Sequence, residues 1–174
     1  MQLSDYLSRV LPSVDACPQP LAEQAIRDAM DSFCRRSRVY RLTESVALTA
    51  GVDTYNLTAP AGSVVAETLY ASIGDDYPLE PLPPELETRL YAGNGDPEYI
   101  QHVDPDTVKI VPAPRDSDTM VVTKVMSIDL TATTFPSVTD RWREGITCGA
   151  LSRLTLMPGK PWSNPQLAGG YAQM

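Results

Sequence analysis

The sequence predicts an α+β fold in which helices from both ends of the chain form one body and a β-rich segment is inserted between them. Residues 21–34 place apolar side chains at helical spacing, whereas from Val39 the pattern alternates as in strands and turn residues interrupt it. Helical spacing returns after Ser137. We therefore predict a discontinuous helical bundle from residues 1–41 and 136–174, with an antiparallel β-sheet or sandwich from residues 42–135.

Two helices are expected before the insertion. A short one covers about Ser4 to Val10, and a longer one over 21–34 carries a single apolar stripe at offsets of three and four residues. The stripe consists of Ala22, Ala25, Ile26, Ala29, Met30, Phe33 and Cys34. Pro18 and Pro20 precede this helix, and arginines follow it, where the helix dipole favours cations.

The middle of the chain is expected to hold strands separated by turns that contain Gly, Pro or Asp. We expect a hairpin over Val46 to Leu57, a strand pair over Asp104 to Pro114 and a brief helix at Pro84 to Tyr91. The predicted strands are Tyr40 to Leu48, Thr54 to Leu57, Val64 to Ile73, Tyr77 to Pro81, Tyr99 to His102, Val108 to Val111 and Met120 to Ser127. The predicted turns are Ala50-Gly51, Gly74-Asp75-Asp76 and Asp104-Pro105-Asp106.

The C-terminal part is expected to form a helix from about Val138 to Met157, with Ser137 and Asp140 in a capping pattern. Arg153 is the only charged residue between Ile146 and Gly159, so the surface of this helix must be largely covered. A Pro-Gly-Lys-Pro elbow then stops the helix before Trp162. A second short helix restarts near Ser163 to Pro165, where Ser163 or Asn164 can cap it and Pro165 suits a first turn.

Charge is distributed unevenly along the 174 residues, whose net charge is −8. Residues 1–41 sum to +1, residues 42–135 to −11 and residues 136–174 to +2. This balance argues against a nonspecific nucleic-acid binder, which needs a surplus of Lys and Arg. Three cysteines at unpatterned spacings argue against a disulfide framework or a zinc site, and no apolar run reaches the roughly 20 residues that span a bilayer. No signal peptide is visible, which favours synthesis in a reducing cytosol.

No pattern in the sequence indicates catalysis, a cofactor or a metal. His102 is the only histidine, so a zinc or nucleophile–base site lacks its usual partners. Carboxylate pairs such as Asp75-Asp76 and Asp104/Asp106 lie in predicted turns without the spacing of a calcium loop. We interpret them as solvated turns and predict a protein that is not an enzyme. A carboxylate pair of a glycosidase remains the weaker enzymatic alternative.

Several segments together resemble the head-to-tail adaptor (connector) proteins of tailed bacteriophages. The most specific is an Ala-Leu-rich helix that ends in MPGKPW (157–162) and continues with NPQLA (164–168). Three others agree in the expected order: DAMDSFCRRSRVYR (28–41), VALTAGVDTYNL (46–57) and DPDTVKIVPAP (104–114). The resemblance covers most of the chain, and none of these segments is a catalytic signature. It therefore implies an architecture and a structural task.

Adaptors of this kind form a ring, usually of twelve subunits, beneath the portal protein of the filled capsid. The resemblance implies that the chain docks on the portal, extends the DNA channel and offers a surface to a tail or nozzle (tail-terminator) protein. Genome DNA would pass through the lumen without specific binding, and no membrane is involved. The site of action would be the virion neck, after assembly in the bacterial host cytoplasm. In relatives the C-terminal segment reaches the portal, which makes Lys160, Trp162, Leu167 and Tyr171 candidates for that contact.

The arginines Arg35, Arg36 and Arg38 have three interpretations. They can form a solvated helix end, pair with carboxylates of a neighbouring subunit, or contact phosphates, which the acidic remainder disfavours. The interpretation as a subunit interface is favoured if the protein is an oligomer.

A rival function for the whole chain is an acidic β-rich carbohydrate- or receptor-binding module of a phage tail. Its stacking surface would use tyrosines among Tyr55, Tyr70, Tyr77, Tyr91 and Tyr99.

Overall fold

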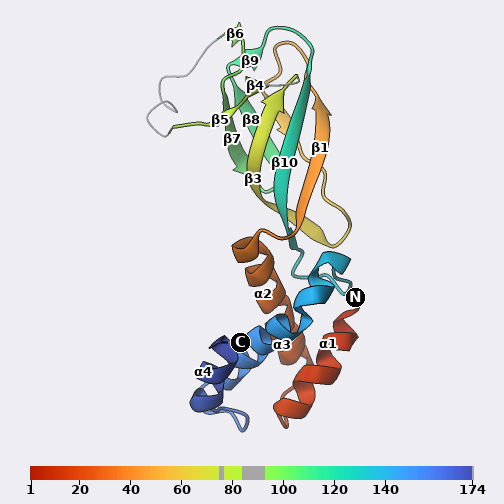
Figure 1. The fold of residues 1–174 in the computed structure, drawn as a ribbon, viewed down its shortest axis with the longest axis vertical. Helices are drawn as coiled ribbons and strands as arrows, with labels where there is room; N and C mark the ends of the chain where they lie inside the picture. Colours follow the sequence, from red (N-terminus) through yellow and green to blue (C-terminus); the bar gives the residue numbers. More distant parts are fainter. Residues whose placement is uncertain (75–76, 84–92, 174) are drawn as a thin grey trace. The chain divides into compact units, whose positions relative to one another are not determined.

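The computed structural model describes residues 1–74, 77–83 and 93–173, and the chain divides into two compact units. The helical unit consists of Met1–Tyr40 and Ser127–Met174, and the β unit consists of Arg41–Met126. Helices and strands occupy separate units (Figure 1), so the predicted α+β fold class is confirmed. The helix predicted at Pro84 to Tyr91 and the turn residues Asp75 and Asp76 lie outside the described residues.

The helical unit is built from four α-helices and two short 3₁₀ segments. They are α1 (Leu3–Val10), η1 (Leu11–Ser13), α2 (Gln19–Ser37), η3 (Ser137–Trp142), α3 (Arg143–Thr155) and α4 (Pro165–Gln173). Both N-terminal helices match their predicted positions, and α2 extends the predicted range by a few residues at each end. Pro20 lies in the first turn of α2, and Arg38 ends it in a left-handed conformation (φ 52°) while its N–H bonds the Cys34 carbonyl at 3.0 Å.

The core of the helical unit lies among α1, α2 and α3. Its buried side chains are Leu3, Tyr6, Leu7, Val10, Val14, Ala22, Ala25, Ile26, Ala29, Met30, Cys34, Ile128, Ala132, Phe135, Ile146, Ala150, Leu151 and Leu154. Small residues let α2 and α3 approach closely: a Cβ placed on Gly149 would lie 3.4 Å from the Cβ of Ala29. The sparsely charged α3 is therefore covered on two sides, by α2 and by α4.

Residues 127–135, which the sequence assigns to the insertion, lie in the helical unit. Backbone bonds tie this segment to the N-terminus: the Leu3 N–H bonds the Thr133 carbonyl at 2.9 Å, and the Phe135 N–H bonds the Met1 carbonyl at 2.7 Å. The Arg27 Nε donates to the Ala132 carbonyl at 3.1 Å. An isolated β-bridge between Gln2 and Thr134 also joins the segment to the start of the chain.

The single helix predicted from Val138 to Met157 is interrupted. Residues Ser137–Trp142 form the 3₁₀ helix η3, and α3 begins only at Arg143. The predicted cap is also wrong, because Pro136 occupies the N-cap position and no side chain caps η3. Instead, the Thr139 hydroxyl and N–H both bond the Pro136 carbonyl, at 2.7 and 3.1 Å, which tightens the first turn.

The described residues of the β unit form two four-stranded sheets and one two-stranded pair. The first sheet has the order β1-β10-β3-β4, the second β2-β8-β7-β5, and β6 pairs with β9. The strands are β1 (Arg41–Ala47), β2 (Thr54–Asn56), β3 (Ser63–Ile73), β4 (Tyr77–Pro78), β5 (Glu80–Pro81), β6 (Asn94–Gly95), β7 (Tyr99–Asp104), β8 (Thr107–Val111), β9 (Ala113–Pro114) and β10 (Thr119–Ile128). Two short pairs, β5–β7 and β6–β9, are parallel, so the arrangement is mixed and not purely antiparallel.

The strand pair predicted over Asp104 to Pro114 is displaced: this range holds the last residue of β7, the turn, β8 and β9, and β8 pairs with β7, which begins at Tyr99. The hairpin predicted over Val46 to Leu57 is wrong. β1 pairs with β10, whereas β2 pairs with β8 in the other sheet. The turn between β1 and β2 does form around Gly51 (φ 76°). The hydroxyl of Tyr55 accepts from the Thr49 N–H at 3.1 Å and donates to the Val52 carbonyl at 2.8 Å. The buried tyrosine therefore holds the turn as it leads from one sheet to the other.

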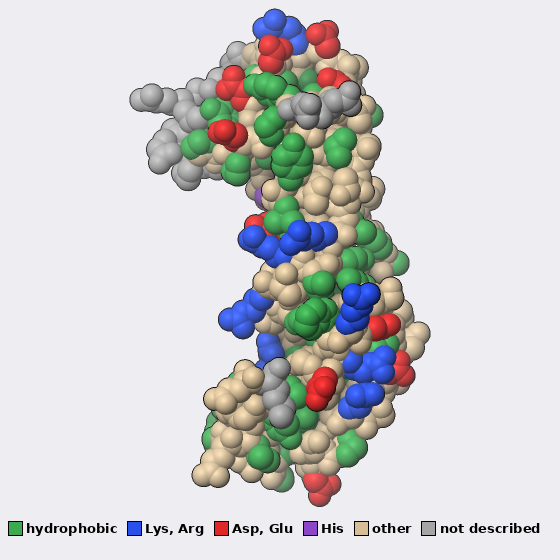
Figure 2. Space-filling model, in the orientation of Figure 1, with side chains coloured by type: hydrophobic (Ala, Val, Ile, Leu, Met, Phe, Trp, Pro, Cys, Tyr) green, Lys and Arg blue, Asp and Glu red, His purple; other side chains and the backbone are tan. Residues whose placement is uncertain are grey.

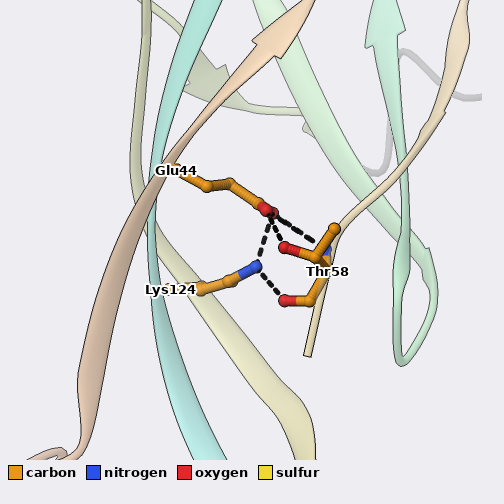
Figure 3. A network of polar contacts seen from close by, with 3 residues as sticks. All are labelled: Glu44, Thr58 and Lys124. Atoms are coloured by element: carbon orange, nitrogen blue, oxygen red, sulfur yellow. Dashed lines mark hydrogen bonds and ion pairs between the residues drawn. The ribbon is translucent and has the colours of Figure 1, made fainter. Parts of the chain in front are cut away.

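A buried lysine connects the two sheets (Figure 3). Lys124 on β10 has a side chain that is 1% exposed, and its Nζ lies 2.5 Å from a carboxylate oxygen of Glu44 on β1. The same ammonium donates to the carbonyl of Thr58, which follows β2, and the Thr58 N–H and hydroxyl donate to Glu44. We call these three residues the Lys124 cluster. It provides hydrogen-bond partners for the buried ammonium and for the partly buried Glu44 carboxylate, and it links the first sheet to the segment after β2.

We predict that Lys124→Met destabilises the protein far more than Lys109→Met. The first change leaves the Glu44 carboxylate without its cation, which costs about 3 kcal/mol or more for a buried pair. Lys109 also forms an ion pair, at 3.1 Å to Asp53, but both side chains are more than 40% exposed, so its loss should cost at most about 1 kcal/mol. Urea unfolding of both variants measures the difference. Equal losses would contradict a structural role for the cluster.

The Lys124 cluster should also make stability depend on pH. Burial acts to raise the pKa of Glu44, but hydrogen bonds from Lys124 and Thr58 outweigh burial and hold this pKa below its ordinary value. The stabilisation is therefore complete above the ordinary pKa of about 4.3 and is lost as the pH falls through the lowered value. We expect Glu44→Gln to be less stable than the wild type at pH 7, with a gap that narrows below about pH 4. A gap that stays constant in unfolding measurements down to pH 3 would refute this assignment.

Candidate interaction surfaces

The arginine cluster predicted as a subunit interface lies at the C-terminal end of α2. Arg35 forms an ion pair within its own helix, with Nε 2.8 Å from Asp31 Oδ1, and the same carboxylate oxygen accepts the Ser127 hydroxyl at 2.7 Å. Arg36 and Arg38 are exposed. The guanidinium of Arg35 is therefore held in place from one side and about half exposed on the other. This geometry suits contact with a carboxylate of another chain.

An exposed aromatic side chain lies close to these arginines. Trp142 is 49% exposed, and its ring centroid is 5.7 Å from that of Phe33 on α2. Phe33 is one helical turn before Arg36 on α2, so cations and aromatic surface occur together. Figure 2 shows Lys and Arg side chains close to hydrophobic ones over the helical unit. Trp142 is the last residue of η3, and this 3₁₀ segment leaves its side chain at the surface.

The Pro-Gly-Lys-Pro elbow ends α3 and turns the chain back onto it. Gly159 has φ 70°, which favours glycine, and the Asn164 N–H returns to the Thr155 carbonyl at 2.8 Å. Asn164 caps α4, since its Oδ1 accepts from the Leu167 N–H at 3.2 Å, and Pro165 is the first helical residue. The predicted cap and restart are confirmed.

The elbow borders a hollow of about 310 Å³ in the helical unit. It is lined by Ser13, Asp15, Ala16, Thr155, Pro161, Trp162, Ser163, Asn164 and Leu167. Two of the four predicted portal-contact residues, Trp162 and Leu167, therefore line one surface feature. The indole Nε1 of Trp162 is buried and bonds no atom of the described residues, while Leu167 is 52% exposed. The hollow thus has an apolar rim, and the N–H of one of its lining side chains is buried without a hydrogen-bond partner among the described residues.

The other two predicted contact residues differ from each other. Tyr171 packs against the helical core from α4, and Lys160 is exposed in the elbow. Trp162 also packs against the core, so it has a structural role beside any contact with a partner. The two roles can be separated by experiment because Leu167 lines the same hollow without that core contact.

The tyrosines of the β unit do not share one environment. Tyr70 and Tyr77 are 49% and 54% exposed, whereas Tyr55 is buried and holds the turn described above. Tyr99 is half-buried, and Tyr91 lies outside the described residues. His102 is exposed at the surface of β7, and burial of its ring by neighbours lowers its pKa. Tyr55 is therefore a packing residue, which weakens the expected stacking surface for a sugar.

Within residues 1–74, 77–83 and 93–173, no group of three or more His, Cys, Asp or Glu side chains is arranged to hold a metal ion. The three cysteines are free thiols, and burial raises the pKa of Cys34 to about 11, so this thiol is a poor nucleophile. None of the described helices has the length and apolar character needed to cross a bilayer.

Comparison with known proteins gives the family of this chain. The family model described as SU10 adaptor protein matches residues 1–174. The chain belongs to this family of phage head-to-tail adaptors. Adaptors are structural proteins and not a class of enzymes, and membership supports a role at the junction of head and tail. No curated protein matches the chain.

We predict that Trp162→Ala and Leu167→Ala affect the isolated adaptor subunit differently. Trp162→Ala removes a large side chain that packs against the core, so the free energy of unfolding should fall by about 2 to 3 kcal/mol. Leu167→Ala trims an exposed side chain and should change it by less than about 0.5 kcal/mol. Thermal or urea unfolding measures both. If Trp162→Ala left stability unchanged, its core role would be wrong.

Proposed function

We propose that this adaptor assembles into a ring of twelve copies that docks on the portal protein in the virion neck. The ring extends the DNA channel and presents a docking surface to a tail or nozzle protein. Assembly takes place in the host cytoplasm. The observation that carries this proposal is the match of the adaptor family over the whole chain, residues 1–174. The β insertion would act as a separate folding unit within each subunit.

Charge supports the proposed channel. A ring of twelve subunits would carry a formal charge of 12 × (−8) = −96. Such a ring repels DNA phosphates, which suits a passage that must not retain its cargo. Most of the acidity belongs to the β unit: residues 41–126 hold five basic and fourteen acidic residues, a net charge of −9. The helical unit carries the remaining +1.

The hollow at the elbow supports the choice of the C-terminal segment for portal docking. Leu167 offers exposed apolar surface at the hollow, Trp162 lines the same hollow, and Lys160 is exposed in the same elbow. Tryptophan is prominent among residues that dominate interface energies, because it buries a large apolar area and can still donate one hydrogen bond. The prolines of the elbow limit the conformations that must be lost when a partner binds.

The mass of the assembled particle tests the proposal. Native mass spectrometry of the purified chain, alone and with its portal protein, should give a ring of twelve copies and a complex of that ring with the portal. A chain that stays a single copy even with the portal would refute the ring. In the same assay Arg35→Ala with Arg36→Ala should weaken assembly by 1 kcal/mol or more, on the order of a partly desolvated charge pair.

Two comparisons make this result specific. Arg9→Ala removes another exposed arginine, in the last turn of α1, and should leave assembly unchanged. The change at Arg35 also removes an ion pair with Asp31 inside α2, which should cost the subunit only about 0.5 kcal/mol. If the Arg35 and Arg36 variant assembles like the wild type at moderate salt, the cluster is a solvated helix end.

A further inference from the structure

Each unit exposes a large hydrophobic side chain next to charges, and the two sets of charges have opposite sign. In the helical unit Trp142 is 49% exposed, and in the β unit Val103 is 54% exposed. Trp142 follows Arg141 in the sequence, whereas Val103 precedes Asp104. Exposed apolar side chains bordered by polar ones are typical of surfaces that bind another protein.

The exposed tryptophan of the helical unit lies among cations and a second aromatic ring. We call Phe33, Arg36, Arg141 and Trp142 the Trp142 surface. The ring centroids of Trp142 and Phe33 are 5.7 Å apart, and Arg36 shares a face of α2 with Phe33, three residues before it. Both arginines are exposed, and neither forms an ion pair with residues 1–74, 77–83 or 93–173. Tryptophan and arginine are the residue types that most often dominate interface energies.

The acidic residues close to Trp142 in the sequence act on other groups. Asp140 and Arg143 both lie near enough to Tyr6 for their charges to affect its hydroxyl, in opposite directions. Glu144 lies near Cys148, one helical turn further along α3. No described ion pair therefore offsets the two cations of the Trp142 surface, and a partner with negative charge is favoured.

The β unit exposes Val103 through an irregularity of the β7–β8 hairpin. The register of β7 against β8 shifts between His102 and Asp104, so Val103 has no residue opposite it. An extra residue of this kind bends the strand and can re-aim a side chain, and Val103 is exposed. Residues 103–106, with the sequence Val-Asp-Pro-Asp, are all exposed, and we call them the β7–β8 turn.

The two carboxylates of the β7–β8 turn also have no cation beside them. Neither Asp104 nor Asp106 forms an ion pair with a described residue. Lys109 on β8 is already paired with Asp53, at 3.1 Å. The turn therefore combines apolar surface with two negative charges, which is the complement of the Trp142 surface.

We propose that the Trp142 surface of one copy binds the β7–β8 turn of a neighbouring copy. The two arginines face the two aspartates, and the indole of Trp142 covers Val103 and Pro105. This inference rests on the ring proposed above and names the acidic partner of the arginines. The contact joins two different surfaces of the chain, which is the kind of interface that closes into rings.

Charge makes a contact of this kind effective. Each copy carries a net charge of −8, so copies repel one another unless opposite charges meet at their contact. Aromatic and aliphatic side chains that exclude water strengthen the ion pairs beside them. The Trp142 surface and the β7–β8 turn supply both parts of this arrangement.

Reversal of charge on each side, followed by rescue, tests the contact. Arg36→Glu with Arg141→Glu should weaken assembly at least about tenfold, because attractive pairs become repulsive. Asp104→Lys with Asp106→Lys should weaken it by a similar factor. A chain with all four changes restores opposite charges and should assemble within about threefold of the wild type. Native mass spectrometry over a range of protein concentrations measures assembly, and circular dichroism confirms the fold of each variant.

A matched control places the same charge elsewhere on the β unit. Asp96→Lys with Asp116→Lys changes the net charge equally, at exposed positions that line a hollow together with Arg115. This variant should assemble at least as well as the wild type, because it lowers the repulsion between copies. It should not rescue the chain that carries Arg36→Glu and Arg141→Glu. Rescue by this control would mean that net charge alone acts, and would overturn the contact.

Hydroxyl-radical footprinting of the unmodified chain gives a second readout that needs no substitution. Oxidation of Trp142 and of Val103 should fall when the copies assemble, because each side chain covers the other. Unchanged oxidation of Trp142, or reversed variants that assemble normally, overturns the contact while the ring itself stands. A folded chain with all four changes that stays as weak as its parents overturns it as well. A wild-type chain that never assembles overturns both proposals.

Discussion

The side chain of Lys124 is 1% exposed, so it places a positive charge inside the β unit. Glu44 and Thr58 supply the hydrogen-bond acceptors for this charge. Removing an ammonium from water costs several kcal/mol unless partners replace the lost hydrogen bonds. The partners come from β1 and from the segment after β2, so the first strand and both sheets must be in place together. Slipping β1 by one residue against β10 would turn Glu44 to the outer face. The cluster therefore fixes the register of β1 against β10.

In the helical unit the corresponding constraint is a set of backbone hydrogen bonds between the returning segment and the N-terminus. The chain leaves this unit after Tyr40 and returns at Ser127, and the returning segment binds the first residues through bonds of Leu3 and Phe135. Tyr6 adds an edge-to-face contact with Phe135 at a centroid distance of 5.6 Å. An insertion between the two halves is tolerated because these contacts, and the packing of α3 on α2, define the unit without it.

The sequence predicts elements where one local pattern dominates and fails where distant residues decide. The stripe of α2 and the cap of α4 depend on neighbours within four residues, and both are confirmed. Alternation predicts that β1 and β2 are strands but not which strands they pair with, so the expected hairpin is wrong. The same limit applies to surfaces: the sequence identified Trp162 and Leu167, but the hollow they share also needs the Ser13–Ala16 loop, far away in the chain.

The division of charge between the units links architecture to function. The helical unit has nearly balanced charge, whereas the β unit is strongly acidic. Both units carry large exposed apolar side chains, among them Trp142 and Leu167 in the first and Tyr77 and Val103 in the second. Apolar contacts form where charges are few, and an acidic surface resists both DNA and the close approach of a like surface. If acidic units are to be neighbours in a ring, their contact must gain free energy without burying charge.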